Sequence, residues 1–387
     1  MNTLAHPDSR RRPSFMKKKN WFQQHRRLTI VIVALILLAA TVFVILFLSN
    51  RRESDVDEVQ PELAKPTLYY SPLTGRETSQ EKTNAPILAV MIENSPEARP
   101  QSGLAEAGIV FEAVAEGGIT RFVALYQETE PSLVGPVRSV RPYYLDWAAA
   151  FDPAVAHVGG SDEALRMARS GNYGVDLDQF YNDSAYWRSR DRQAPHNMYT
   201  DYAHLSELAK LKGKSTSQFD GFTRQEIVDN EEDSENTSDD KDEKAQTKSI
   251  SDDKAKATNV NLTISSGAYA VAYQYDETTA TYKRSIGGKP HLNRALDKTE
   301  TQIAPDVVIA MRVNQTLSSD RVHNQISTTR GGEVFVFQDG QIIKGTWAKS
   351  SSSSQIKFLD QENQEIKLKR GQTWITAIPN DKAVTWK

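Results

Sequence analysis

The segments that decide the fold are PILAVMIENSPEARPQSGLAEAGIVFEAVAEGGITRFVALYQ (86–127), LVGPVRSVRPYYLDW (133–147) and PAVAHVGGS (153–161). They combine apolar, strand-like runs with a density of charged residues that no other part of the chain matches. Ile87–Ile92 is almost purely apolar and ends at Glu93-Asn94-Ser95-Pro96, which is typical of a buried strand followed by a turn. We therefore predict a central strand here, with a sheet built around it.

A β-hairpin is predicted next along the chain. Ile109–Glu116 and Ile119–Gln127 are β-rich, and Gly117-Gly118 between them favours a tight turn because glycine adopts positive φ at no steric cost. Glu112 and Glu116 are expected on the same face of the first strand, about 13 Å apart. That distance is too large for the carboxylate pair of a retaining glycosidase, which needs about 5 Å. A partner for acid–base chemistry would have to come from another strand.

Three arginines lie within this charged segment. Arg121 follows the glycine turn, and Arg138 and Arg141 lie in the motif Gly-Pro-Val-Arg-Ser-Val-Arg-Pro. Pro142 indicates that Arg141 is still extended or lies just outside a helix. An apolar sheet core seldom contains several arginines unless negative charge meets them. That charge could come from a bound anion or from acidic residues of the chain itself, namely Glu112, Glu116 and Asp162.

A glycine turn after the next predicted strand could contribute to an anion site. Pro153–Val158 is predicted as a strand that leads into Gly159, Gly160 and Ser161, and Asp162–Ser170 as a helix with Ser161 as its N-cap. A strand, a glycine pair and a helix start together leave backbone N–H groups free to bind an anion. The alternative is that the two glycines only form the turn.

A second group of arginines, Arg188, Arg190 and Arg192, alternates within Trp187–Arg192. If this segment were a strand, the three side chains would lie on one face. Their positive charges would then repel one another unless a bound anion or nearby carboxylates neutralised them. We therefore add them to the predicted anion site, with a solvated basic edge as the alternative. Asp191 lies between them.

Several kinds of catalytic site are excluded by composition and spacing. The chain has no cysteine, so it has no disulfide, thiol nucleophile or cysteine zinc site. It contains no HExxH and no GxSxG motif, and no metal or cofactor is predicted. If the protein is an enzyme, the candidate acid–base residues are Glu112, Glu116, Asp162, Asp191, His157 and His196.

These residues also carry a resemblance to a known family. The motifs MIENSPEARPQSGL, EAVAEGGITRF, GPVRSVRPYYLD, HVGGS, RQAPHNMYT, GTWAKSSSS and GQTWITAIP resemble those of the YerB-like family of bacterial envelope proteins. The resemblance implies export and two domains of unknown function, and it supplies no catalytic residues. Typical members look like lipoproteins that carry a lipidated cysteine. This chain lacks that cysteine, so another anchor must replace it.

The N-terminus supplies such an anchor. Leu28–Leu48 is an apolar run of 21 residues, long enough to cross a bilayer as a helix and longer than the apolar region of a cleaved signal peptide. Residues 1–27 contain eight basic residues and one acidic residue. The positive-inside rule therefore places this tail in the cytoplasm and everything after the span outside the cell membrane, with a single pass.

Composition divides the rest of the chain into a polar tether, two domains and a linker. The tether covers 49–68, an α/β or α+β domain covers 69–222, an acidic linker covers 223–258 and a mostly β domain covers 259–387. The linker has almost no large apolar residue and is predicted to be disordered. The formal net charge of −3 hides a basic N-terminus and this acidic segment, and neither supports nucleic-acid binding by the folded part.

The last domain is predicted from short β-rich runs between turns. Asp339-Gly340 is its clearest hairpin signal, and one helical turn is expected near His291–Leu296. Trp347, Trp374 and Trp386 could line a sugar-binding face, although core packing is the more usual role of such residues.

Two classes of function remain open. The first is a non-catalytic, membrane-anchored protein whose first domain binds an anionic envelope polymer, lipid or protein partner through its arginines. The second is an envelope enzyme that acts on phosphorylated or phosphodiester-linked glycans or lipids. A carboxylate facing an empty, arginine-lined pocket would favour the enzyme, whereas arginines paired to acids would favour the non-catalytic protein.

Overall fold

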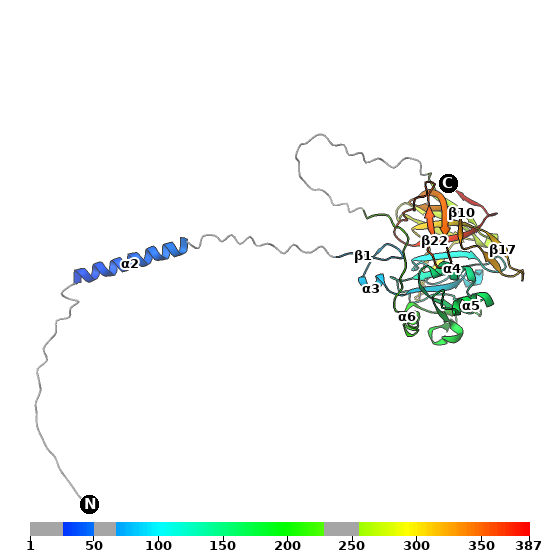
Figure 1. The fold of residues 1–387 in the computed structure, drawn as a ribbon, viewed down its shortest axis with the longest axis horizontal. Helices are drawn as coiled ribbons and strands as arrows, with labels where there is room; N and C mark the ends of the chain where they lie inside the picture. The colour runs from blue at the N-terminus through cyan, green and yellow to red at the C-terminus, as the bar shows by residue number, and fades with distance from the viewer. Residues whose placement is uncertain (1–25, 50–66, 228–254) are drawn as a thin grey trace, which may run out of the picture. The chain divides into compact units, whose positions relative to one another are not determined.

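The structure is a computed structural model that describes residues 26–49, 67–227 and 255–387, in two separate units, Met1–Pro66 and Thr67–Lys387 (Figure 1). In the first unit it describes helix α2 (Arg26–Ser49). The stretch Leu28–Ser49 of α2 is, among the described residues, the one helical segment long and apolar enough to cross a membrane. Most of the predicted cytoplasmic tail and tether, and the centre of the acidic linker, lie outside the described residues.

The second unit is organised around a ten-stranded sheet that takes strands from both predicted domains. Its order is β21-β20-β19-β16-β22-β4-β5-β3-β6-β7. The strands are β3 (Ile87–Glu93), β4 (Ile109–Val114), β5 (Thr120–Tyr126), β6 (Pro153–His157), β7 (Val175–Asp178), β16 (Val307–Val313), β19 (Arg330–Gln338), β20 (Gln341–Lys349), β21 (Lys357–Leu359) and β22 (Thr373–Pro379).

Two layers cover this sheet. Helices α4 (Pro142–Ala149) and α5 (Asp162–Arg169) share one apolar core with one face of the sheet. The other core contains helix α6 (Tyr202–Leu211) and a five-stranded antiparallel sheet. That sheet consists of β13 (Lys289–Pro290), β12 (Thr281–Ile286), β11 (Ala270–Asp276), β10 (Asn259–Thr263) and β23 (Val384–Trp386).

The remaining elements are short. They are β1 (Tyr69–Tyr70), β2 (Glu77–Thr78), α3 (Gln80–Thr83), β8 (Trp187–Arg188), β9 (Met198–Tyr199), β14 (Leu292–Arg294), β15 (Glu300–Gln302), β17 (Gln315–Leu317) and β18 (Asn324–Ile326). The predicted fold class is confirmed: an α/β first part is followed by a mostly β second part.

The two parts join at the pairing of β4 with β22. These strands run parallel, and Ile109 to Glu112 lie opposite Thr373 to Thr376. The chain on either side of the acidic segment also packs into the folded unit, because Ala257 is fully buried and Arg224 donates hydrogen bonds to Leu73 O and Lys369 O. The ordered parts therefore extend into the segment that we predicted as linker, 223–258.

Strand direction gives the sheet one distinctive edge. Strands β16 and β22 run parallel to β4, and β3 runs parallel to β6 and β7, while β5 is antiparallel to both β4 and β3. All six of these parallel strands therefore end at the same side, which we call the carboxyl edge. Ligands of open α/β sheets bind at such an edge.

A buried ion pair joins the main sheet to the second sheet. Glu112 on β4 and Arg284 on β12 are both fully buried, with Arg284 Nη2 2.8 Å from Glu112 Oε2. Arg284 lies over the ring of Trp374, 4.4 Å from its centroid, and the Trp374 indole N–H donates to Glu112 Oε2 at 3.2 Å. A buried charge pair is tolerated only when its other hydrogen-bonding groups are also satisfied, and this one meets that condition.

His291 extends the network in a defined tautomer. Arg284 Nε donates to His291 Nδ1 at 2.9 Å, so the ring proton is on Nε2, which faces Gln101 Oε1 at 2.9 Å. Burial, together with the charges of Arg284 and Arg99, holds the pKa of His291 well below its ordinary value of 6.5. Because the unfolded chain binds this proton more readily, the contribution of His291 to stability is complete above about pH 6.5 and is lost as the pH falls.

Local sequence signals were mostly confirmed. Strands β4 and β5 form the expected hairpin at Gly117-Gly118, and β19 and β20 form one at Asp339-Gly340, with positive φ at all four turn residues. The helical turn predicted near His291–Leu296 is wrong, because that segment contains strand β14. Trp347 and Trp374 are buried core residues, and Trp386 is partly buried against Phe335 and Phe337.

The shared sheet predicts that the two parts stay together when the chain is cut between them. A protease recognition sequence inserted within residues 228–254 should allow complete cleavage, and the two fragments should then co-elute in size-exclusion chromatography. The physical reason is that separation would expose the β4–β22 pairing and both apolar cores. A denaturing gel confirms the cut, and separate elution of the fragments under native conditions would show that they are independent domains.

Candidate functional site

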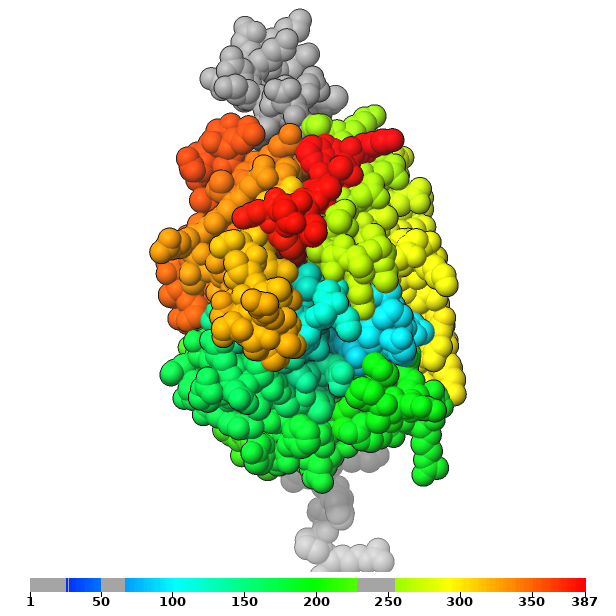
Figure 2. All heavy atoms as spheres, turned by 90° about the vertical axis from the view of Figure 1, so that its right-hand side faces the viewer, coloured from blue at the N-terminus to red at the C-terminus, as the bar shows by residue number. Residues whose placement is uncertain are grey.

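A pocket of 620 Å³ lies at the carboxyl edge, and we call it the edge pocket. Three segments line it: the start of α4, the turn and first residues of α5 after β6, and the β17–β18 hairpin (Gln315–Ile326). The hairpin is the gold segment that projects over cyan and green neighbours in Figure 2. Parts of the chain on both sides of the acidic segment thus build one pocket.

Two helices begin at this pocket. Arg141 is the N-cap of α4, and Pro142 is its first residue, so Arg141 lies just outside the helix as predicted. Ser161 is the predicted N-cap of α5, and its Oγ accepts a hydrogen bond from Ala164 N at 3.4 Å. The first turns of both helices line the pocket, where their free N–H groups and dipoles favour negative charge.

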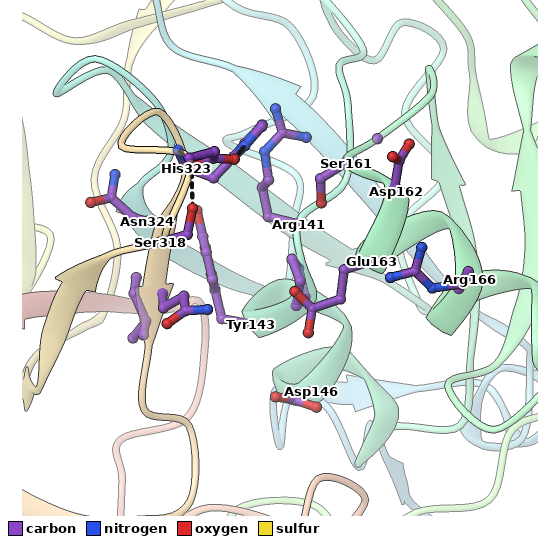
Figure 3. Close-up of a pocket in the computed structure, with 15 residues that line it drawn as sticks. Arg141, Tyr143, Asp146, Ser161, Asp162, Glu163, Arg166, Ser318, His323 and Asn324 are labelled. Atoms are coloured by element: carbon purple, nitrogen blue, oxygen red, sulfur yellow. Dashed lines mark hydrogen bonds and ion pairs between the residues drawn. The ribbon is translucent and has the colours of Figure 1, made fainter.

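A charged triad underlies the pocket, and Arg141 is its one member in the lining. Glu116 pairs with Arg141 and with Arg121, whose Nη2 lies 3.2 Å from Glu116 Oε2. The two arginine side chains are 10% and 7% exposed, and arginine stays protonated in proteins. Two guanidinium groups therefore share one carboxylate, which leaves one buried positive charge in excess. In Figure 3 Arg141 lies between His323 and Ser161.

The β17–β18 hairpin adds two residues that sequence reasoning missed. His323 Nδ1 lies 2.6 Å from Asp320 Oδ2, and His323 Nε2 lies 4.0 Å from Glu116 Oε1. Hydrogen bonds from His323, Ser318 and the backbone hold the pKa of Asp320 below its ordinary range. An Asp and a His three residues apart in a polar turn are a weak signal, and nothing in the linear sequence places them beside Glu116.

Carboxylates also line the pocket. Asp162 and Glu163 are exposed in the first turn of α5, and Asp146 accepts a hydrogen bond from Thr328 Oγ1 at 2.7 Å. Burial raises the pKa of Asp146, although the hydrogen bond from Thr328 opposes this effect. The edge pocket thus combines cationic and acidic residues, a lining suited to a ligand that has both an anionic group and hydroxyl groups.

Arg138 lies outside this pocket. Its Nε is 3.3 Å from Glu93 Oε1, and His196 Nδ1 is 3.0 Å from the same oxygen. The predicted arginines of the first group therefore divide between two acids, Glu93 and Glu116. Gly159, Gly160 and Ser161 form the turn after β6, and the last two of these residues line the edge pocket.

The predicted strand across Trp187–Arg192 is wrong. Strand β8 ends at Arg188, so Arg188, Arg190 and Arg192 do not share a strand face. Arg188 donates to Asn197 Oδ1, Arg190 is exposed, and Arg192 donates to the backbone carbonyls of Glu97 and Pro100. Backbone carbonyls thus satisfy Arg192, and Asp191 forms an exposed ion pair with Lys298 at 3.1 Å.

Two other candidate residues are held inside the protein. Glu112 is buried under Arg284, while Glu116 lies past the end of β4 and pairs with arginines, so the expectation that the two share a strand face is wrong. His157 is fully buried, with Nε2 2.9 Å from Asp176 Oδ1 and Nδ1 2.8 Å from Gly159 O. It is a packed, hydrogen-bonded histidine.

No cluster of three or more His, Cys, Asp or Glu residues suited to a metal ion occurs in the described residues.

Comparison with known proteins assigns the family. Residues 73–217 and 260–375 match the N-terminal and C-terminal domains of a family described as "Protein of unknown function (DUF3048)". The "Putative lipoprotein YerB" of Bacillus subtilis (strain 168) is 31% identical over 344 residues, which cover 87% of this chain and 93% of that protein. The chain belongs to this YerB-like family.

The crystal structure of the Bacillus subtilis YerB protein supports the same fold. It matches with a TM-score of 0.69 and 28% sequence identity, over 82% of this chain and 99% of that one. The name of the relative calls it a lipoprotein, whereas this chain has no cysteine to lipidate and has the apolar helix α2 near its N-terminus.

The triad under the pocket predicts a large effect of removing its single acid. Glu116→Gln should lower the free energy of unfolding by about 3 kcal/mol, because it leaves two largely buried guanidinium groups without a counter-charge. Urea denaturation measures this change. Glu333→Gln is the matched control, since Glu333 is 57% exposed and lies 3.6 Å from Arg312. The control should cost less than about 1 kcal/mol, and equal losses in the two variants would contradict the triad.

Proposed function

We propose that this protein is a membrane-anchored, extracytoplasmic binding protein of the bacterial cell envelope. Helix α2 is the proposed anchor, with the basic N-terminal tail in the cytoplasm and Thr67–Lys387 outside. The proposed ligand is an anionic envelope polymer, lipid or protein partner, which places its negative group at Arg141 in the edge pocket.

One observation carries this proposal: the first turns of α4 and α5 converge on Arg141, whose positive charge Glu116 only half balances. Helix N-termini and an unbalanced guanidinium both favour an anion, and they act at the same place. Arg166, which is exposed on α5 and lines the same pocket, supplies a second positive charge.

The pairing of the arginines favours binding over catalysis. Glu112 is fully buried and Glu116 lies between two arginines, so neither carboxylate is free to act as an acid or base. Two observations are on the side of an enzyme. Asp146, Asp162 and Glu163 line the same pocket as Arg141. In the His323–Asp320 pair the carboxylate could fix the tautomer of a histidine base. An enzyme acting on phosphorylated or phosphodiester-linked glycans or lipids is therefore the second candidate.

Ligand-induced thermal stabilisation tests the binding proposal. The full chain in detergent micelles is heated with inorganic phosphate, polyprenyl phosphate, and teichoic acid or peptidoglycan fragments. A ligand at one hundred times its Kd should stabilise the protein by about 2.7 kcal/mol. Arg166→Gln should weaken binding about tenfold through the loss of one charge-assisted hydrogen bond, whereas Arg330→Gln, at an exposed arginine outside the pocket, should not.

The same samples separate the two candidate functions. If none of these anions changes the melting temperature, or if Arg166→Gln leaves the shift unchanged, the edge pocket is not the anion site. Release of phosphate or sugar by the wild-type chain that disappears in His323→Gln would replace the binding function with the enzymatic one.

A further inference from the structure

A second polar cluster lies at the carboxyl edge, outside the edge pocket. It consists of Glu93 at the end of β3, Ser95, Arg138 and His196. Glu93 Oε1 accepts hydrogen bonds from Ser95 Oγ at 2.9 Å and from His196 Nδ1 at 3.0 Å, and Arg138 Nε lies 3.3 Å away. One carboxylate oxygen thus holds three different side chains.

The other oxygen of Glu93 has no such partner. Glu93 is 3% exposed, and its buried Oε2 has no hydrogen-bond partner within the described parts of the chain. A buried carboxylate oxygen without a donor is costly, so such a group in a native protein indicates an unseen water, ion or ligand.

The contact with Glu93 also fixes the state of His196. Because a carboxylate only accepts hydrogen bonds, the neutral ring carries its proton on Nδ1 and has a lone pair on Nε2. The His196 side chain is 24% exposed, and the structure gives Nε2 no partner among residues 67–227 and 255–387. His196 is thus a hydrogen-bond acceptor whose orientation Glu93 sets.

Arg138 adds an incompletely used positive charge. Its Nε lies 3.3 Å from Glu93 Oε1, its side chain is 29% exposed, and the described residues form no hydrogen bond with its two terminal nitrogens. These nitrogens can therefore donate to an oxyanion.

A purely structural role accounts for this cluster less well. Its role would be to fix the loop that carries His196, yet Arg192 already fixes that loop through the carbonyls of Glu97 and Pro100. Asn197 fixes it again through the carbonyls of Ser189 and Arg192.

We propose that Arg138 and His196 form a second ligand site, for a phosphomonoester, with Glu93 as the positioning residue. Arg138 donates to the phosphate oxyanions, His196 Nε2 accepts a hydrogen bond from the P–OH group, and a donor of the ligand or its water shell reaches Glu93 Oε2. A phosphomonoester fits because its second pKa is about 6, so near that pH it presents both oxyanions and a P–OH group.

Histidine NMR tests this site separately from the edge pocket. The full chain is prepared in detergent micelles with isotope-labelled histidine and titrated with inorganic phosphate at pH 7, and signals are assigned with His196→Gln and His323→Gln. His196 reports on the second site and His323 on the edge pocket, while buried His291 reports that the fold is intact. We expect the His196 signals to shift saturably.

Matched variants give the decisive comparison. Arg138→Gln should weaken the His196 response at least about tenfold, the loss for one charge-assisted hydrogen bond, and leave the His323 response unchanged. Arg166→Gln should do the reverse. Glu93→Gln should convert His196 from the Nδ1–H tautomer to a mixture, which ring ¹⁵N shifts detect. If Arg138→Gln does not fold, Arg138→Lys replaces it and should bind more weakly, because lysine cannot donate bidentately.

The proposal is overturned if the His196 signals do not respond to phosphate, or if they respond equally in the Arg138 variant. It is also overturned if Glu93→Gln leaves the tautomer unchanged. A response of His323 alone would keep the edge pocket and remove the second site, so the failures of the two proposals are distinguishable. Titration with polyprenyl phosphate and with a sugar phosphate then separates a lipid source of the phosphomonoester from a soluble one.

Discussion

The ion pair between Glu112 and Arg284 is the interaction on which the rest of the structure depends. It joins strands that lie far apart in the sequence, one on each side of the acidic segment, and both partners are fully buried. The desolvation of two buried charges is costly, so the pair is tolerated only because Trp374, Tyr273, His291 and Thr120 satisfy its remaining hydrogen-bonding groups. An incorrect arrangement of the two sheets would leave one of the charges unpaired.

This constraint also positions the edge pocket. Strand β22 lies beside β4, and β16 runs parallel to both. Strand β16 therefore ends at the carboxyl edge, where the chain continues into the β17–β18 hairpin. The hairpin then contacts the turn after β4, where His323 bridges to Glu116 and Asn324 donates to Ala115 O. The second part of the chain thus completes a pocket whose helix N-termini and arginines come from the first part.

The sequence predicted the features that depend on local backbone chemistry. Glycine at Gly117-Gly118 and the Asp339-Gly340 pair identified hairpins because those turns need positive φ. Ser161 was recognisable as an N-cap because its side chain bonds within its own first turn. The arginines of the apolar segment lie near the carboxyl edge, where Arg141 lines the edge pocket.

The features that the sequence did not reveal depend on distant partners. No local signal specifies that β22 pairs with β4, or that Asp320 and His323 meet Glu116. The alternating arginines of Trp187–Arg192 suggested a strand, but the bonds of Arg192 to backbone carbonyls favour an irregular loop instead. Glu93 was not singled out in the sequence because it ends an apolar run, where an acid is usually only the start of a turn.

A double-mutant cycle on Glu112 and Arg284 tests the central claim most directly, with urea denaturation of the full chain in micelles as the measurement. Glu112→Leu and Arg284→Met should each cost about 3–5 kcal/mol, since each leaves a buried charge unpaired. The double variant should cost far less than their sum, with a coupling energy above about 1.5 kcal/mol, whereas the exposed pair Arg294 and Glu300 should couple by less than about 1 kcal/mol. Additive losses at Glu112 and Arg284 would contradict the account, because the two parts would then be held together without this pair.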